Sequence, residues 1–134
     1  MRWAPVALAG ALLLGSLPAS VHAQELTTVL VVRHAEKASD TEDPPLSAQG
    51  WQRAAELARV ARESGVSVLY ATQYLRTRQT LMHVAEALGL EILEHNARDS
   101  EGLAREILED HAGKVVLVAG HSNTVPAIVA ALRA

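Results

Sequence analysis

The sequence predicts an α/β fold of three layers, in which a mostly parallel central sheet carries helices on both faces. Strand-like and helix-like segments alternate four times along the chain, as in successive βαβ units with right-handed crossovers. Thr27–Val32 (TTVLVV) and Val115–Ala119 (VVLVA) are continuous β-branched and aliphatic runs, which are typical of strands buried on both faces. These two observations favour one parallel sheet in a single domain.

The spacing of apolar residues, together with capping and turn residues, locates each helix and strand along the chain. Leu81, Val84 and Leu88 recur at helical spacing, and Gly89 is a typical residue after a helix end. Leu90–Glu94 alternates in polarity, which predicts a strand at the sheet edge. We expect strands at Thr27–Val32, Ser67–Ala71, Leu90–Glu94 and Val115–Ala119, and a loop at Ser39–Pro45. We expect helices from Ser47 as N-cap to Ser64, from Tyr74 to Leu88, from Ser100 as N-cap towards Gly113, and a closing helix that bears Val125 and Leu132.

The N-terminal segment predicts an export signal instead of part of the fold. Arg2 gives a positive start, and Val6–Leu17 is an apolar run. Val21 and Ala23 are small residues at the positions that a signal peptidase reads. The apolar run is shorter than the about 20 residues that a membrane-spanning helix needs. We expect a signal peptide over residues 1–23, cleavage after Ala23, export to the periplasm or the medium without a stable membrane anchor, and a mature domain over residues 24–134.

The composition argues against several classes of function. The 134 residues include no cysteine, which excludes disulfides, thiolate metal sites and thiol nucleophiles. The formal net charge of −3 argues against a nucleic-acid-binding surface, which usually carries a clustered excess of Lys and Arg. An aromatic content of 3% offers no stacking platform for bases. The chemistry must therefore come from His, Arg, Asp, Glu and Ser.

Basic side chains follow three of the predicted strands. Arg33 and His34 come directly after the first strand, Arg76 a few residues after the second, and His121 after the last. In an open parallel sheet the ligand crevice lies outside the carboxyl ends of the strands, so these side chains should meet at one edge. Arginine donors match phosphate oxygens, and a neutral histidine can attack phosphorus. The pattern predicts a site for a phosphoryl group.

Four segments in order carry a resemblance to a known family. They are Val31–Lys37 (VVRHAEK), Pro45–Ala54 (PLSAQGWQRA), Leu69–Thr80 (LYATQYLRTRQT) and Leu117–Asn123 (LVAGHSN). The first is similar to an Arg-His-Gly signature, with Ala35 where Gly is more usual, and the others to a loop-to-helix segment, a second-arginine segment and a second-histidine motif. Together they resemble the histidine phosphatase superfamily, the phosphoglycerate-mutase-like proteins. The resemblance covers Thr27 to Leu132 and implies the fold predicted above.

The resemblance also implies roles for individual residues. His34 would be the nucleophile that becomes phosphohistidine, while Arg33, Arg76 and His121 would bind the phosphoryl oxygens; Arg78 is a neighbour of the matched arginine. The family needs no metal or other cofactor.

The proton donor for the leaving group has no motif of its own. We expect Glu101 to be this acid, with Asp99 and Glu36 as alternatives. Small phosphohistidine phosphatases of the family work without such an acid. Relatives commonly continue into a further strand, so we also expect the domain over residues 24–134 to lack a C-terminal strand.

Hydrolysis is the reaction favoured by these features. The short spacer between Arg76 and His121 lacks the insertion with which mutases close over phosphoglycerate, so the resemblance implies a phosphatase for phosphate monoesters or phosphohistidine. Phosphorylated small molecules, envelope glycolipids and phosphoproteins are the expected substrates, and nucleic acid is not an expected partner. Two alternatives remain open: a non-catalytic phosphate-binding or interaction module on the same fold, and a metal-dependent hydrolase that uses His34, Glu36 and His121.

Overall fold

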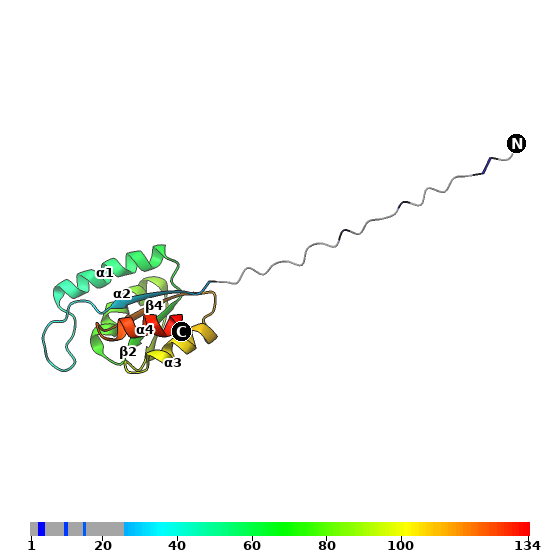
Figure 1. Ribbon diagram of the computed structural model, residues 1–134. Helices are drawn as coiled ribbons and strands as arrows, with labels where there is room; N and C mark the ends of the chain where they lie inside the picture. The colour runs from blue at the N-terminus through cyan, green and yellow to red at the C-terminus, as the bar shows by residue number, and fades with distance from the viewer. Residues whose placement is uncertain (1–2, 5–9, 11–14, 16–25) are drawn as a thin grey trace.

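The computed structural model describes residues 26–134 and, before them, residues 3–4, 10 and 15 (Figure 1). The expected signal peptide over residues 1–23 lies, apart from those few positions, outside the described residues. None of the helices in the described part combines the length and the apolar character that a membrane crossing requires.

A parallel sheet of four strands forms the centre of the fold, and strands and helices alternate strictly along the chain. The order of the strands across the sheet is β1-β4-β2-β3, and every neighbouring pair is parallel. The strands are β1 (Thr28–Arg33), β2 (Val68–Thr72), β3 (Ile92–His95) and β4 (Val115–Gly120). The helices are α1 (Ala48–Glu63), α2 (Leu75–Leu88), α3 (Ser100–Asp110) and α4 (Thr124–Arg133).

Two aliphatic clusters attach the helices to the two faces of this sheet (Figure 1). Leu69 and Leu117 point to the face covered by α1 and α2, where they pack with Leu81 of α2. The alternate strand residues, such as Tyr70, point to the other face and pack with Ile107 of α3. Burying one aliphatic side chain fully contributes about 1.5–3 kcal/mol to the free energy of folding, relative to leaving it exposed. Because successive strand residues point to opposite faces, this burial holds helices against both faces of the sheet. The predicted fold class is confirmed.

The strand β1 corrects one expectation. The sequence predicts burial on both faces, and this prediction is wrong for β1, whose residues are half-buried in the middle and exposed at the ends. The reason is its place at the sheet edge beside β4: both aliphatic clusters centre on β2 and β4, which are buried almost throughout. The edge position predicted for the third strand is confirmed, with bounds shifted to Ile92–His95.

The start of α3 corrects a second expectation. Asp99, and not Ser100, is the N-cap residue, because its Oδ1 accepts a hydrogen bond of 2.9 Å from Gly102 N. Asp99 N itself donates to Asn96 O at 3.0 Å, so a turn ends at Asp99 and helical backbone begins one residue later. An aspartate is as effective in this position as the predicted serine.

Gly50 lies where α1 approaches the segment that follows β1. The N-cap residue Ser47 accepts a hydrogen bond of 3.1 Å from Gly50 N and donates its own N–H to Glu36 O at 2.8 Å. A Cβ atom on residue 50 would collide with Glu36 O and come within 3.1 Å of the Leu46 Cβ. Glycine therefore allows a helix to touch backbone here.

Replacing this glycine should cost stability although it improves helix propensity. Gly50→Ala gains up to about 1 kcal/mol in propensity, but the rigid contact with the Glu36 carbonyl forces α1 away from the loop. We expect a net loss of about 2 kcal/mol in the free energy of unfolding, measured by urea denaturation. Gln52→Ala, at an exposed position of the same helix, should change that free energy by less than about 0.5 kcal/mol. A Gly50→Ala protein as stable as the wild type would contradict the close contact.

Candidate active site

The register of the parallel strands places their carboxyl ends at the same edge of the sheet. Arg33 pairs with Gly120 between β1 and β4, and Ala71 pairs with Ala119 between β2 and β4. His34 N continues the ladder by donating to Gly120 O at 2.9 Å. The residues that follow each strand therefore share one edge, as the sequence predicts.

A cavity of about 390 Å³ opens at this edge. It is lined by Arg33, His34, Lys37, Tyr74, Arg76, Ala97, Arg98, His121, Ser122, Asn123 and Thr124. These residues come from the segments after all four strands, and they include four cationic side chains. Four of the five residues that the sequence analysis places in the site line this cavity, namely Arg33, His34, Arg76 and His121.

His34 is held with a defined ring orientation. Its Nδ1–H donates to Ala35 O at 2.7 Å, and Nε2 forms no hydrogen bond with any residue that the structure describes. Because one ring nitrogen of a neutral imidazole carries the proton, Nε2 bears the lone pair. Burial lowers the pKa of His34 below its usual value despite the hydrogen bond to Ala35, and Arg76 and Arg33 lower the pKa further. His34 is therefore neutral and nucleophilic at neutral pH.

Arg76 lies half-buried in the wall of the cavity, with its side chain 17% exposed. Its Nη2 donates to His121 Nδ1 at 3.3 Å, and its guanidinium carbon lies 4.7 Å from the ring centre of Tyr74. Its Nε and Nη1 are buried without a hydrogen-bond partner among the described residues. Nη1 lies 3.9 Å from Asp43 Oδ1, which is an ion-pair distance but too long for a hydrogen bond. The guanidinium therefore keeps hydrogen-bonding capacity, and its charge suits an anion at the cavity.

His121 is 7% exposed and lies between the cavity and the protein interior. Its ring centre is 5.4 Å from that of His34 and 5.2 Å from that of Tyr74. Its Nε2 is 2.9 Å from Thr72 Oγ1. Burial first, and then the charges of Arg76 and its neighbours, lower the pKa of His121 from 6.5 to about 4. The second histidine is thus uncharged at neutral pH.

The three candidate acids do not line this cavity. Glu101 borders a different cavity with Ala104 and Leu108 on α3, and Asp99 caps α3 beside an acidic hollow. Glu36 borders a hollow next to His34, but its Oε1 pairs with Arg53 Nη2 at 2.6 Å. The hydrogen bond from Arg53 lowers the pKa of Glu36, which favours the ionised carboxylate and not a proton donor. No Asp or Glu within the described residues lines the cavity of His34 and His121.

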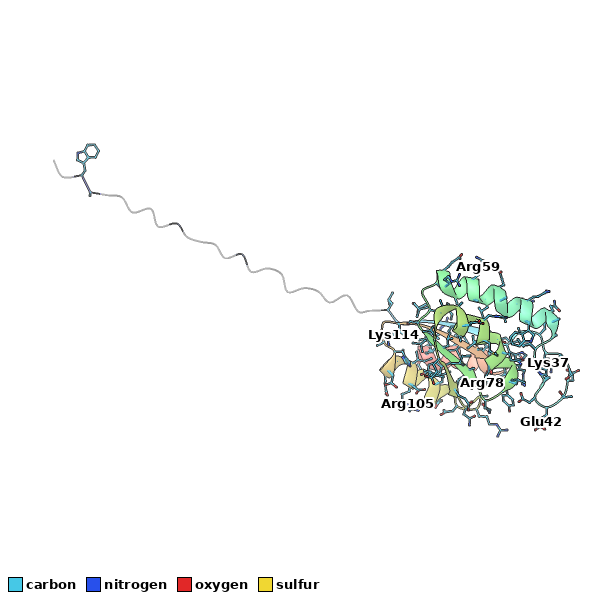
Figure 2. All side chains as sticks on the ribbon, turned by 180° about the vertical axis from the view of Figure 1, so that it is seen from behind. Lys37, Glu42, Arg59, Arg78, Arg105 and Lys114 are labelled. Atoms are coloured by element: carbon cyan, nitrogen blue, oxygen red, sulfur yellow. The ribbon has the colours of Figure 1, made fainter. Side chains whose placement is uncertain are left out.

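Several residues of the site were not among those that the sequence analysis assigned to it. Tyr74, Lys37 and Arg98 contribute an aromatic wall and two cations. Asp43 Oδ1 accepts a hydrogen bond of 2.9 Å from Leu75 N, at the start of α2, and lies 3.9 Å from Arg76 Nη1. Asp43 belongs to a loop that is remote from α2 in sequence, and Figure 2 shows neighbouring Glu42 on a projecting part of that loop. Of these residues, only Lys37 could have been assigned to the site from the sequence, because its positive charge lies close to the Arg33–His34 pair along the chain.

Comparisons with solved structures identify relatives of the fold. A protein histidine phosphatase SixA, solved with tungstate, superposes with a TM-score of 0.63 at 22% identity, covering 76% of this chain and 74% of that one. A mycobacterial glucosyl-3-phosphoglycerate phosphatase superposes with a TM-score of 0.69 at 15% identity, covering 78% of each chain. At these identities the likeness establishes the fold alone.

Sequence comparisons identify the family. Proteins described as probable phosphoglycerate mutase GpmB, from Enterobacter sp. (strain 638) and Escherichia fergusonii, are 36% identical over 72 residues, which are 48% of this chain and 34% of theirs. The chain thus spans about a third of the length of these curated relatives. The sequence profile of the histidine phosphatase superfamily (branch 1) matches residues 29–98, a segment that includes Arg33, His34 and Arg76. Because this match covers just over half of the sequence and the surrounding fold agrees with it, the chain belongs to the histidine phosphatase superfamily.

Proposed function

We propose that the chain is a phosphatase that hydrolyses phosphate monoesters or phosphohistidine through a phosphohistidine intermediate on His34. One observation carries this proposal. The partly buried guanidinium of Arg76 and the lone pair of His34 Nε2 belong to residues that line the same cavity. An anion that satisfies Arg76 there is placed beside a nucleophile, which is the arrangement that phosphoryl transfer needs.

The reaction follows in two displacements. His34 Nε2 attacks phosphorus in line, so that the N–P bond forms while the bond to the leaving atom breaks and its electron pair departs with the leaving group. Water then attacks phosphorus and passes one proton to a phosphoryl oxygen, the N–P bond breaks with its electron pair returning to Nε2, and inorganic phosphate leaves with neutral His34 restored. Ala35 O holds the Nδ1–H in both steps and stabilises the positive charge on the phosphorylated ring. Arg33 and Arg76 neutralise the charge on the phosphoryl oxygens.

The lining of the cavity favours leaving groups that need no acid from the protein. Phosphohistidine fits this requirement, since its imidazole departs as a neutral molecule once protonated, and so do monoesters of acidic alcohols. Lys37 and Arg98 add positive charge at the cavity and would attract phosphorylated small molecules, envelope glycolipids or phosphoproteins. No cofactor is needed for either displacement.

The two alternatives differ in their support. A non-catalytic phosphate-binding module is favoured by the same lack of a carboxylate on the cavity within the described chain. A metal-dependent hydrolase has less support, because Glu36 is engaged by Arg53. No group of three His, Asp or Glu side chains with metal-binding geometry occurs in the described residues. Labelling of His34 separates the proposed enzyme from a binding module.

His34→Ala should abolish turnover because it removes the attacking nitrogen. We expect phosphate release to fall by about a thousandfold or more, on the scale seen when other enzymes lose their nucleophile. Acid-labile, base-stable phosphate label should appear on the wild type and not on the variant. Arg105→Ala is the control, since Arg105 lies on α3, well away from Lys37 (Figure 2). Near-full activity in His34→Ala would contradict the assignment, and a wild type that binds phosphate without ever labelling would favour the binding module.

Arg76 and Arg78 form a matched pair for testing the anion site. Both belong to α2, but Arg76 lines the cavity while Arg78 pairs with Glu94 at 3.1 Å. Arg76→Ala should weaken the binding of inorganic phosphate by about tenfold or more, because hydrogen bonds to charged groups are worth about 1.5–3 kcal/mol. Titration calorimetry measures this, and Arg78→Ala should bind phosphate like the wild type. Equal affinity in Arg76→Ala would remove Arg76 from the site.

We also propose that the protein is exported and processed after Ala23. The pattern of Arg2, the apolar run Val6–Leu17 and the small residues Val21 and Ala23 supports this proposal. Expression of the full chain in a bacterial host should yield a mature protein in the periplasm or medium whose N-terminal residue is Gln24, as determined by terminal sequencing. Ala23→Asp should leave the precursor uncut. A wild-type protein that keeps Met1 and stays in the cytoplasm would contradict export.

A further inference from the structure

A chain of buried hydroxyl groups lies behind His121. His121 Nε2 is 2.9 Å from Thr72 Oγ1, which is 2.8 Å from Thr77 Oγ1, and Thr77 Oγ1 is 2.8 Å from Tyr74 O. Thr72 is the last residue of β2 and Thr77 lies in the first turn of α2. Both threonines are fully buried. The chain therefore runs through the buried interior from the histidine ring to a backbone carbonyl.

The direction of each hydrogen bond in this chain follows from its end. A carbonyl can only accept, so the Thr77 hydroxyl donates to Tyr74 O. Thr77 Oγ1 then accepts the proton of Thr72 Oγ1, and it also accepts from Thr72 N at 3.1 Å. The Thr72 hydroxyl has thus used its one proton and must accept from the ring. His121 Nε2 therefore carries the hydrogen.

The other side of the ring leads to the same conclusion independently. Arg76 Nη2 lies 3.3 Å from His121 Nδ1, and a guanidinium has only protons to offer. Nδ1 must therefore present a lone pair. Both contacts specify one neutral tautomer, with the hydrogen on Nε2 and the lone pair on Nδ1, towards Arg76 in the cavity wall.

The charged groups around His121 act against a proton on Nδ1 while the cavity is empty. Burial lowers the pKa of His121 most, and the charges of Arg76 from α2 and Arg33 from β1 lower it further. The other titratable groups beside the ring are His34 and His95, and burial lowers the pKa of each of them. Tyr74 packs its ring edge-on against the imidazole. A bound anion reverses this balance, because its oxygens offset the two guanidinium charges and accept a hydrogen bond from a protonated Nδ1.

We propose that Thr72 and Thr77 are positioning residues that hold His121 with its lone pair on Nδ1, so that the phosphoryl group is bound together with one proton shared between Nδ1 and a phosphoryl oxygen. This inference rests on the proposed function for the identity of the anion. A monoanionic phosphoryl group brings the proton with it. A dianionic one takes up one proton from solution, and that proton stays at the phosphoryl oxygens instead of passing to the leaving group.

Proton uptake on phosphate binding tests the proposal. Titration calorimetry with inorganic phosphate, in buffers of different ionisation heat and one pH unit above the second pKa of phosphate, counts the protons taken up. The wild type should take up close to one proton for each phosphate bound. Thr72→Val keeps the shape but removes the acceptor for Nε2–H. The ring should then carry its hydrogen on Nδ1, which donates directly to the dianion, and the uptake should fall close to zero.

Two control variants separate this role from simple packing. Thr72→Ser restores the hydroxyl and should restore the proton uptake. Thr80→Val removes a buried hydroxyl from α2, the helix that also carries Thr77. This hydroxyl accepts a hydrogen bond of 2.9 Å from Ala35 N and does not contact the His121 ring, so the proton uptake of this variant should match that of the wild type. If Thr72→Val does not fold, Thr77→Val serves in its place, since the freed Thr72 hydroxyl would turn its proton towards Nε2.

Nitrogen NMR of the histidine rings gives a readout that needs neither phosphate nor turnover. The empty wild type and Thr72→Ser should show His121 as the Nε2–H tautomer, and Thr72→Val as the Nδ1–H tautomer. An Nδ1–H ring in the wild type, or equal proton uptake in the wild type and Thr72→Val, would overturn the proposal. Phosphate that never binds would overturn it as well. If the tautomer and the uptake are as expected but His34 never becomes labelled, the proposed function fails and the inference about Thr72 and Thr77 stands.

Discussion

The parallel register of β1, β4 and β2 is the constraint on which the rest of the structure depends. Because Arg33 aligns with Gly120 and Ala71 with Ala119, each strand delivers its following residue to the same edge. The carboxyl ends of these strands leave the sheet together, so side chains that are far apart in sequence form one cavity without any long connecting segment. The aliphatic clusters on both faces hold this register, and the site inherits its rigidity from them.

Electrostatics then gives each residue of the cavity its chemical state. Burial first, and then the charges of Arg76 and Arg33, keep the two histidines uncharged, which leaves a lone pair on His34 Nε2 and a second one on His121 Nδ1. The same positive field would attract a phosphoryl anion that the uncharged rings alone would bind weakly. Glu36 pairs with Arg53 instead of contributing to this cavity, although it lies two residues from His34.

Sequence reasoning located the fold and the strand-end residues because both depend on local patterns. Aliphatic runs mark strands, and the residue after a strand has a known place in a parallel sheet, so His34 and His121 could be assigned to one edge before any coordinates. Thr72 and Asp43 could not be found in this way, since their roles depend on contacts between segments that are far apart along the chain. The exposure of β1 was missed for a similar reason. An aliphatic run shows that a strand is apolar, but its neighbours in the sheet decide how deeply it is buried.

The guanidinium donors of Arg76 also bear on how the proposed phosphatase would respond to its own product. Inorganic phosphate offers these donors the same oxygens as the phosphoryl group of a substrate, so the guanidinium stabilises the bound product as well as the bound reactant. Binding energy that is equal in both states tightens association without accelerating chemistry. In the proposed reaction, inorganic phosphate at high concentration would therefore compete with the substrate for Arg76 and inhibit turnover.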